Sequence, residues 1–67
     1  MENKIEMFLK KWNEMLEAAN DIEGFKYEFS VSVVSDNALI PQREKLISGI
    51  NHSFTKNNMH YKSSSQN

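Results

Sequence analysis

The residues with the readiest acid–base and metal-binding chemistry are the two histidines, His52 and His60. A metal site needs further ligands at a defined spacing, and a general base needs a hydroxyl or carboxylate positioned beside it. Neither arrangement surrounds these histidines, and the absence of cysteine also excludes disulfides, thiolate zinc sites and cysteine nucleophiles. A chain of 67 residues can hardly enclose a pocket that excludes water. We therefore expect a protein that is not an enzyme and that binds neither a metal nor a cofactor.

Two cations, Arg43 and Lys45, stand near the predicted start of a helix, where backbone amides point outward and favour anions. They support an alternative function, in which an oligomer sequesters a small anionic ligand such as a nucleotide between its subunits. A nucleic-acid partner is not expected, because the net charge is −1 and binding to phosphates scales with the number of charges neutralised.

Aromatic side chains are the other group with binding chemistry, since bases and planar cofactors stack on them. Their spacing favours a structural interpretation, because each falls on the apolar stripe of a predicted helix or on the apolar face of a predicted strand. We interpret this group as the core: Phe8, Trp12, Met15, Phe25, Tyr27 and Phe29.

Residues 4–23 predict an amphipathic helix. Asn3 and Glu6 form a variant of the capping box, and Gly24 suits the left-handed conformation that ends many helices. Apolar residues recur at steps of three and four, as one face of a helix requires. They are Ile5, Phe8, Leu9, Trp12, Met15, Leu16, Ala19 and Ile22. The acidic residues off this stripe either make the helix soluble or dock on a basic partner; they include Glu14, Glu17 and Asp21.

Residues 25–34 alternate as a half-buried β-strand does, with a period of two. One face carries Phe25, Tyr27, Phe29, Val31 and Val33, and the other carries Lys26, Glu28, Ser30 and Ser32. The helix ends almost where this strand begins, so we expect the apolar faces of the two to bury each other.

The rest of the chain predicts short elements and a tail. Residues 35–37 have turn chemistry, and 38–40 are expected to return as a short second strand, because Pro41 holds Ile40 extended. Pro41 suits the first turn of a second helix, whose end we place between 48 and 55 because Gly49 weakens it. Residues 56–67 are polar and predict a disordered tail. The prediction is one α+β domain over residues 1–55, followed by that tail.

The predicted strand is too long for the sheet that the rest of the chain supplies. Its backbone donors and acceptors would remain open, and natural proteins rarely leave such an edge exposed. Antiparallel pairing about a twofold axis through residues 25–31 would join two hairpins into a four-stranded sheet. We therefore expect a homodimer, whose pairing strand contains Phe25, Tyr27, Phe29 and Val31.

These observations predict a small protein-binding module, acting as a regulator or inhibitor of another macromolecule. Its expected contacts are Lys26, Glu28, Ser30 and Ser32 on the sheet and Glu14, Glu17 and Asp21 on the helix. Frequent Asn and Lys residues are typical of AT-rich genes and suggest a phage or other mobile element. A structural subunit of a larger assembly is a further alternative. Residues 1–4 do not resemble a secretory signal and no segment suits a membrane span, so we expect a cytoplasmic location.

Overall fold

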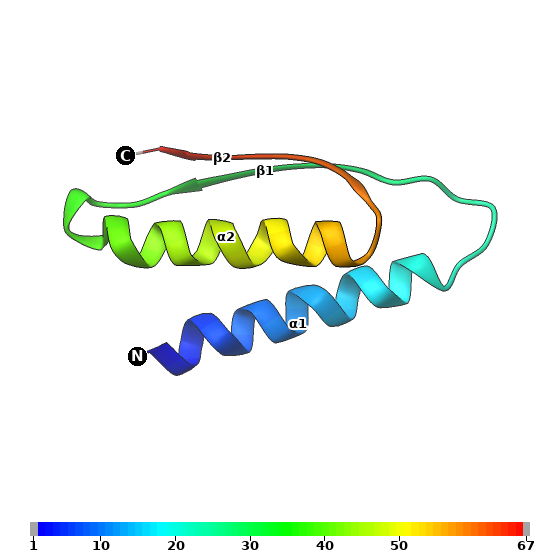
Figure 1. Cartoon of the computed structure of the whole chain (residues 1–67), viewed down its shortest axis with the longest axis horizontal. Helices are drawn as coiled ribbons and strands as arrows, with labels where there is room; N and C mark the ends of the chain where they lie inside the picture. Colours follow the sequence, from blue (N-terminus) through cyan, green and yellow to red (C-terminus); the bar gives the residue numbers. More distant parts are fainter. Residues whose placement is uncertain (1, 67) are drawn as a thin grey trace.

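Helices and strands alternate along the chain, which the computed structural model describes over residues 2–66 (Figure 1). The order is α1 (Glu2–Asn20), β1 (Glu28–Val34), the 3-10 helix η1 (Asn37–Leu39), α2 (Ile40–Lys56) and β2 (His60–Gln66). β1 and β2 form a two-stranded parallel sheet, with α2 as the crossover that parallel strands require. The prediction of an α+β fold with two helices is confirmed.

The first helix forms where its apolar periodicity predicts. It begins at Glu2, so Asn3 lies within the helix and is not its predicted N-cap, and it ends at Asn20. The last turn tightens, because the amides of Asp21 and Ile22 donate to carbonyls three residues earlier at 3.2 Å. Gly24 adopts the predicted left-handed conformation, with φ of 88°, within the loop that follows the helix. The side-chain amide of Asn20 donates to the carbonyl oxygen of Asn57 at 3.0 Å and ties the ends of both helices together.

The predicted strand is confirmed over residues 28–34, where exposed and half-buried side chains alternate. Phe29, Val31 and Val33 pack against the core, as their face of the strand predicts. Residues 25–27 are not part of the strand. The ladder begins where Glu28 pairs with His60, and the residues before Glu28 are not part of it.

The second strand predicted at 38–40 is wrong. Residues 37–39 form η1, in which the amide of Leu39 donates to the carbonyl of Asp36 at 2.9 Å. Ile40 has helical dihedrals, φ −55° and ψ −45°, and Pro41 occupies the first turn of α2 as predicted. The bias of a residue before proline toward extended backbone is a preference only, and the hydrogen-bonded turn leads directly into the helix.

The second helix continues through Gly49, and this glycine allows α1 and α2 to pack closely. A Cβ placed on Gly49 would overlap Cδ1 of Leu9 and lie 3.1 Å from its Cγ. Glycine therefore lets Leu9 of α1 reach the backbone of α2, and this tertiary contact outweighs the weak helix propensity of glycine.

Replacing Gly49 by alanine is expected to lower the free energy of unfolding by about 1–3 kcal/mol, because the new methyl group overlaps Leu9. In an exposed helix the same change would stabilise the protein by about 1 kcal/mol. The sign of the change in the free energy of unfolding therefore shows whether the contact with Leu9 outweighs helix propensity. Urea denaturation measures the difference. In a Leu9→Ala background the overlap disappears and Gly49→Ala should become neutral or stabilising. Equal destabilisation in both backgrounds would show that Leu9 is not the cause.

The end of α2 is a Schellman motif built on two asparagines. Asn58 is left-handed, with φ of 54°, and the amides of Asn58 and Met59 donate to the carbonyls of Thr55 and Phe54. Asn57 is buried, and its side-chain amide donates to the carbonyl of Ser53 at 2.8 Å and to Oδ1 of Asn13 at 3.1 Å. These hydrogen bonds satisfy the buried amide and fix α1 against the end of α2.

The disordered tail predicted at 56–67 is corrected by β2. Residues 60–66 pair with the whole of β1 in register, from Glu28 opposite His60 to Val34 opposite Gln66. Two side-chain contacts anchor this strand on α2. The ring of Tyr61 stacks on Phe54 with centroids 4.6 Å apart, and the hydroxyl of Ser63 donates to Oδ1 of Asn51. Backbone pairing is available to any residue, so a polar composition did not prevent a strand. Residue 67 lies outside the described residues.

The core lies between the two helices and one face of the sheet. Its fully buried side chains are Leu16, Ile50 and Phe54. Phe54 is the centre of an aromatic cluster, with Trp12, Phe29 and Tyr61 around its ring at centroid distances of 5.5, 5.4 and 4.6 Å. Neither α1 nor α2 is long and apolar enough to cross a membrane.

Candidate protein-binding surface

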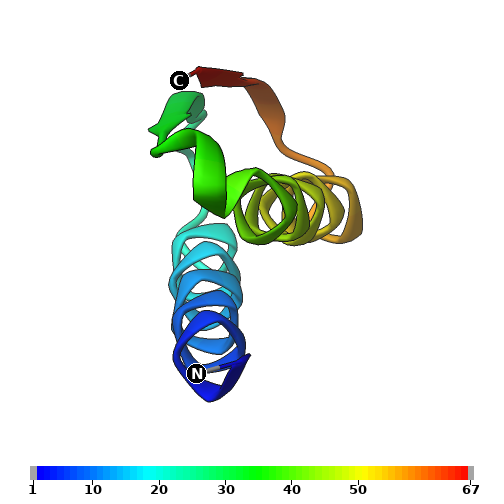
Figure 2. The ribbon, with the colours of Figure 1, turned by 90° about the vertical axis from the view of Figure 1, so that its left-hand side faces the viewer.

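The sheet has only two strands within the described chain, so each strand pairs along one edge and leaves its other edge open. Both helices lie on the same face of this sheet, with α1 on the β1 side and α2 on the β2 side (Figure 2). Parallel sheets are normally larger and covered on both faces, and open edges are usually blocked or paired. The free edge of β1 is therefore a candidate binding surface.

An exposed apolar flank of α1 lies on the same side of the molecule as this free edge. The opposite flank of α1 faces α2, through Leu9 at Gly49 and Asn20 at Asn57. Between the two flanks, Trp12 points to β1 and meets Phe29 with ring centroids 6.2 Å apart. The free flank carries Phe8 and Met15, which are both 48% exposed. Beyond the end of the helix, Ile22 and Phe25 are 52% and 67% exposed.

We define the β1-edge surface as the open edge of residues 28–34 together with Phe8, Met15, Ile22 and Phe25. The interpretation of Phe8, Met15 and Phe25 as core residues is thus corrected. The sheet and α2 cover only part of the apolar stripe of α1, and Phe25 lies exposed in the loop before β1. The apolar stripe of α1 is wider than one packed helix face needs. In the sequence, this excess width was the feature that indicated a second, uncovered apolar flank. Exposed apolar groups beside an open strand edge are typical of a protein interface.

The opposite edge of the sheet, along β2, is flanked by polar side chains. The flank of α2 beside β2 exposes the polar residues Ser48, His52 and Thr55, and β2 itself exposes Lys62. A lysine on an edge strand is a common device against pairing with another chain. The contrast between the two edges identifies β1 as the edge suited to a partner.

The four sheet residues predicted to contact a partner are all exposed: Lys26, Glu28, Ser30 and Ser32. Glu28, Ser30 and Ser32 project from the face of β1 away from the helices, and Lys26 precedes the strand. In β2, Lys62 pairs with Ser30 and so projects from the same face. The outer face of the sheet is therefore polar and carries charges of both signs.

The helix residues predicted for the same role are also exposed, but they lie elsewhere. Glu14, Glu17 and Asp21 follow the side of α1 that is turned away from its apolar stripe, and Glu17 accepts a hydrogen bond from the amide of Asn13 at 2.8 Å. The helices cover the inner face of the sheet (Figure 2). Since these three residues lie on the side of α1 away from its apolar stripe, they lie on the other side of the molecule from the outer sheet face. The structure does not bring the two groups together.

The structure also separates Arg43 from Lys45, the pair expected at an anionic ligand. Arg43 is buried in the first turns of α2, with Nε 3.8 Å from Oε2 of Glu44, whereas Lys45 is exposed. Residues two apart on a helix do not face each other. Arg43 instead lines an apolar hollow of about 180 Å³ with Val33, Leu46 and their neighbours.

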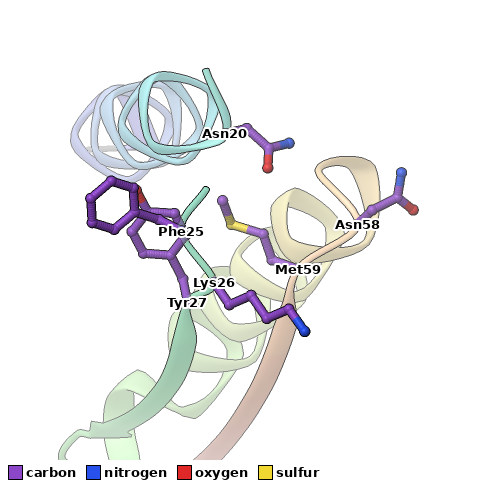
Figure 3. Close-up of a pocket in the computed structure, with 6 residues that line it drawn as sticks. All are labelled: Asn20, Phe25, Lys26, Tyr27, Asn58 and Met59. Carbon is purple, nitrogen blue, oxygen red and sulfur yellow. The ribbon is translucent and has the colours of Figure 1, made fainter. Parts of the chain in front are cut away.

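The described part of the chain has open hollows on its surface. One of about 400 Å³ lies at the first pairs of the ladder and is lined by Glu28, Phe29, Tyr61 and Lys62. Another of about 220 Å³ lies between the loop before β1 and the turn before β2 (Figure 3). It is lined by Asn20, Phe25, Lys26, Tyr27, Asn58 and Met59. Ligand pockets usually exceed about 300 Å³ and enclose most of the ligand. Among the described residues, no three histidine or carboxylate side chains gather closely enough to hold a metal ion.

Comparisons with known proteins add no constraint on what this surface binds. Models of protein families, curated proteins and solved structures were all searched, and none of them matches the chain.

Proposed function

We propose that the protein is a non-enzymatic protein-binding module that works as a homodimer and regulates or inhibits another macromolecule. The observation that carries this proposal is the β1-edge surface, where an open strand edge and the exposed flank of α1 lie side by side. Strand pairing across such an edge provides main-chain hydrogen bonds, and the adjacent apolar side chains provide burial.

A binding role also agrees with the small size of the core. Only three apolar side chains are fully buried among the described residues, and a domain of this length buries about 60% of its unfolded surface. Association would bury Phe8, Met15 and their neighbours and would stabilise the folded chain by mass action. The interface is therefore expected to add stability that the small core, which contains no disulfide, does not supply.

The outer face of the sheet is the proposed contact for the regulated target. Pairing through β1 leaves this face open, with Glu28, Ser30 and Ser32 on one strand and Lys62 on the other. In a homodimer the face would be doubled across the axis, which would favour a target surface long enough to meet both halves.

The homodimer is tested by the molar mass in solution at micromolar concentration, measured by light scattering. The wild-type chain is expected at twice the mass of one chain. A Phe8→Glu, Met15→Glu variant should weaken the dimer by roughly 10-fold to 100-fold, because charges at half-exposed apolar sites lose burial worth about 1.4–2.8 kcal/mol. The matched control, Ser48→Glu with His52→Glu, places the same charges on the polar flank of α2 and should remain dimeric.

A wild-type chain that stays monomeric would contradict the homodimer, and equal masses for both variants would contradict the β1-edge surface. The target role is tested separately, by capture from host lysate with the wild-type chain and with a Glu28→Lys, Ser32→Lys variant. One stoichiometric protein that the wild-type chain retains and the variant loses is the expected result. Equal retention by both would show that the outer sheet face is not the contact.

A further inference from the structure

Strand β1 is complementary to itself when two copies pair antiparallel about an axis at Val31. Residue i then lies opposite residue 62 − i of the second copy, and side chains directly opposite each other share a face of the sheet. On the inner face Phe29 meets Val33, and Val31 meets Val31. On the outer face Ser30 meets Ser32, a pair of hydroxyls that suits cross-strand hydrogen bonding.

Just beyond the strand, this register places opposite charges together. Lys26 lies opposite Asp36 of the second copy, and the twofold axis creates this pair twice. Both side chains are exposed in the single chain, and the backbone of Asp36 is extended, with φ −66° and ψ 156°. Asp36 makes no capping hydrogen bond from its side chain to η1, which leaves the carboxylate available.

We infer that the occupant of the β1-edge surface is a second copy of this chain, paired antiparallel about Val31, with Lys26 of each copy opposite Asp36 of the other. This inference rests on the proposed function and specifies its interface. The assembled sheet has the order β2, β1, β1, β2, and its outermost strands are the ones that expose Lys62.

Neighbouring registers are less favourable. Moving the axis to Ser32 places Glu28 opposite Asp36, and like charges directly opposite each other are destabilising. Moving it to Ser30 removes the pairing of Lys26 with Asp36 and places Lys26 opposite Val34. Moving it by half a step places the apolar face of one strand beside the polar face of the other. Of these registers, only the one about Val31 places opposite charges together.

The helix below the sheet supports the same axis. Trp12 contacts Phe29, and Ile5 lines one hollow with Val33, so the part of α1 between Ile5 and Trp12 lies below Val31. Phe8 is in that part of the helix and on its exposed flank. A twofold axis at Val31 therefore brings Phe8 of one copy to Phe8 of the other and buries the two rings that the single chain leaves half exposed.

Disulfide cross-linking of single-cysteine variants tests the register of the two β1 strands. In an antiparallel pair, residues directly opposite have Cα atoms about 4.5–5.5 Å apart, which a disulfide can span, whereas diagonal neighbours are about 7–8 Å apart. Full-length Val31→Cys should therefore form a disulfide-linked dimer under mild oxidation. Ser30→Cys alone and Ser32→Cys alone should not, but an equimolar mixture of these two variants should cross-link. Cross-linking of Ser30→Cys alone or Ser32→Cys alone, without Val31→Cys, would overturn the register and leave the homodimer intact.

A charge exchange tests the inference without touching the core. Lys26→Asp and Asp36→Lys should each weaken the dimer by about fivefold, because each turns two attractive pairs into repulsive ones. The double variant restores opposite charges and should recover most of the wild-type affinity. Sedimentation at low salt measures all four proteins. Additive weakening in the double variant would show that the two residues do not meet, whereas a monomeric wild-type chain would contradict the homodimer itself.

Discussion

Replacing Phe54 by alanine is expected to remove a large part of the free energy of unfolding of the protein. Phe54 is fully buried, and its ring contacts Trp12, Phe29 and Tyr61, which belong to α1, β1 and β2. Truncating such a phenylalanine costs about 3–5 kcal/mol, from lost burial and the cavity that remains. A chain of 67 residues has roughly 3–10 kcal/mol in total, at about 0.05–0.15 kcal/mol per residue.

Urea denaturation followed by far-ultraviolet circular dichroism gives the measurement, with every variant at the same chain concentration because association adds to stability. Phe54→Leu is the matched control. It keeps most of the buried volume, should cost about 1.5 kcal/mol or less, and should leave a cooperative transition. A Phe54→Ala protein that retains the wild-type midpoint would show that the aromatic cluster is not the centre of the core.

The elements that the sequence predicted well are those whose signal is local. The apolar stripe of α1 repeats over five turns of helix, the alternation of β1 needs only neighbouring residues, and Pro41 marks the start of α2 within one position. In each of these elements one face is buried, and the spacing of apolar residues along the sequence shows that face directly. The end of α1 and the first residues of β1 were less well placed, because side-chain ties and strand pairing decide them.

The errors concern contacts between distant parts of the chain. Gly49 looked like a weak point of α2, but its role is to admit Leu9, which is forty residues earlier. The segment 60–66 looked disordered because its polar side chains can bury little apolar surface, yet a strand needs only a partner backbone and an anchor. Tyr61 is that anchor through its stack on Phe54.

The candidate surface was only partly visible for the same reason. The sequence indicated an open strand edge, and the structure retains one on β1, although β2 occupies the other. The apolar flank of α1 was assigned to the core, since a sequence does not show how much of a wide stripe its neighbours can cover. An apolar stripe wider than about 100° in a short chain therefore indicates an interface as well as a core.

Ending the chain after Met59 distinguishes these two interpretations of the C-terminal segment. A disordered tail is dispensable, so its removal would leave the unfolding midpoint unchanged. The structure predicts the opposite, because β2 provides the whole ladder for β1 and covers Phe54 with Tyr61. Without β2, β1 has no partner strand within its own subunit and the central ring of the core meets water, at a cost of about 3 kcal/mol or more.

The shortened chain should therefore lose its cooperative urea transition, and amide protons of β1 should exchange with solvent without protection. Full-length Tyr61→Ala is the control that separates the stack from the ladder. It keeps the backbone pairing of residues 60–66 and should lose only about 1–2 kcal/mol, from the aromatic contact and its half-buried area. The expected order of stability is wild type, then Tyr61→Ala, then the shortened chain. A shortened chain as stable as the full one would mean that β1 has no partner strand within its own subunit.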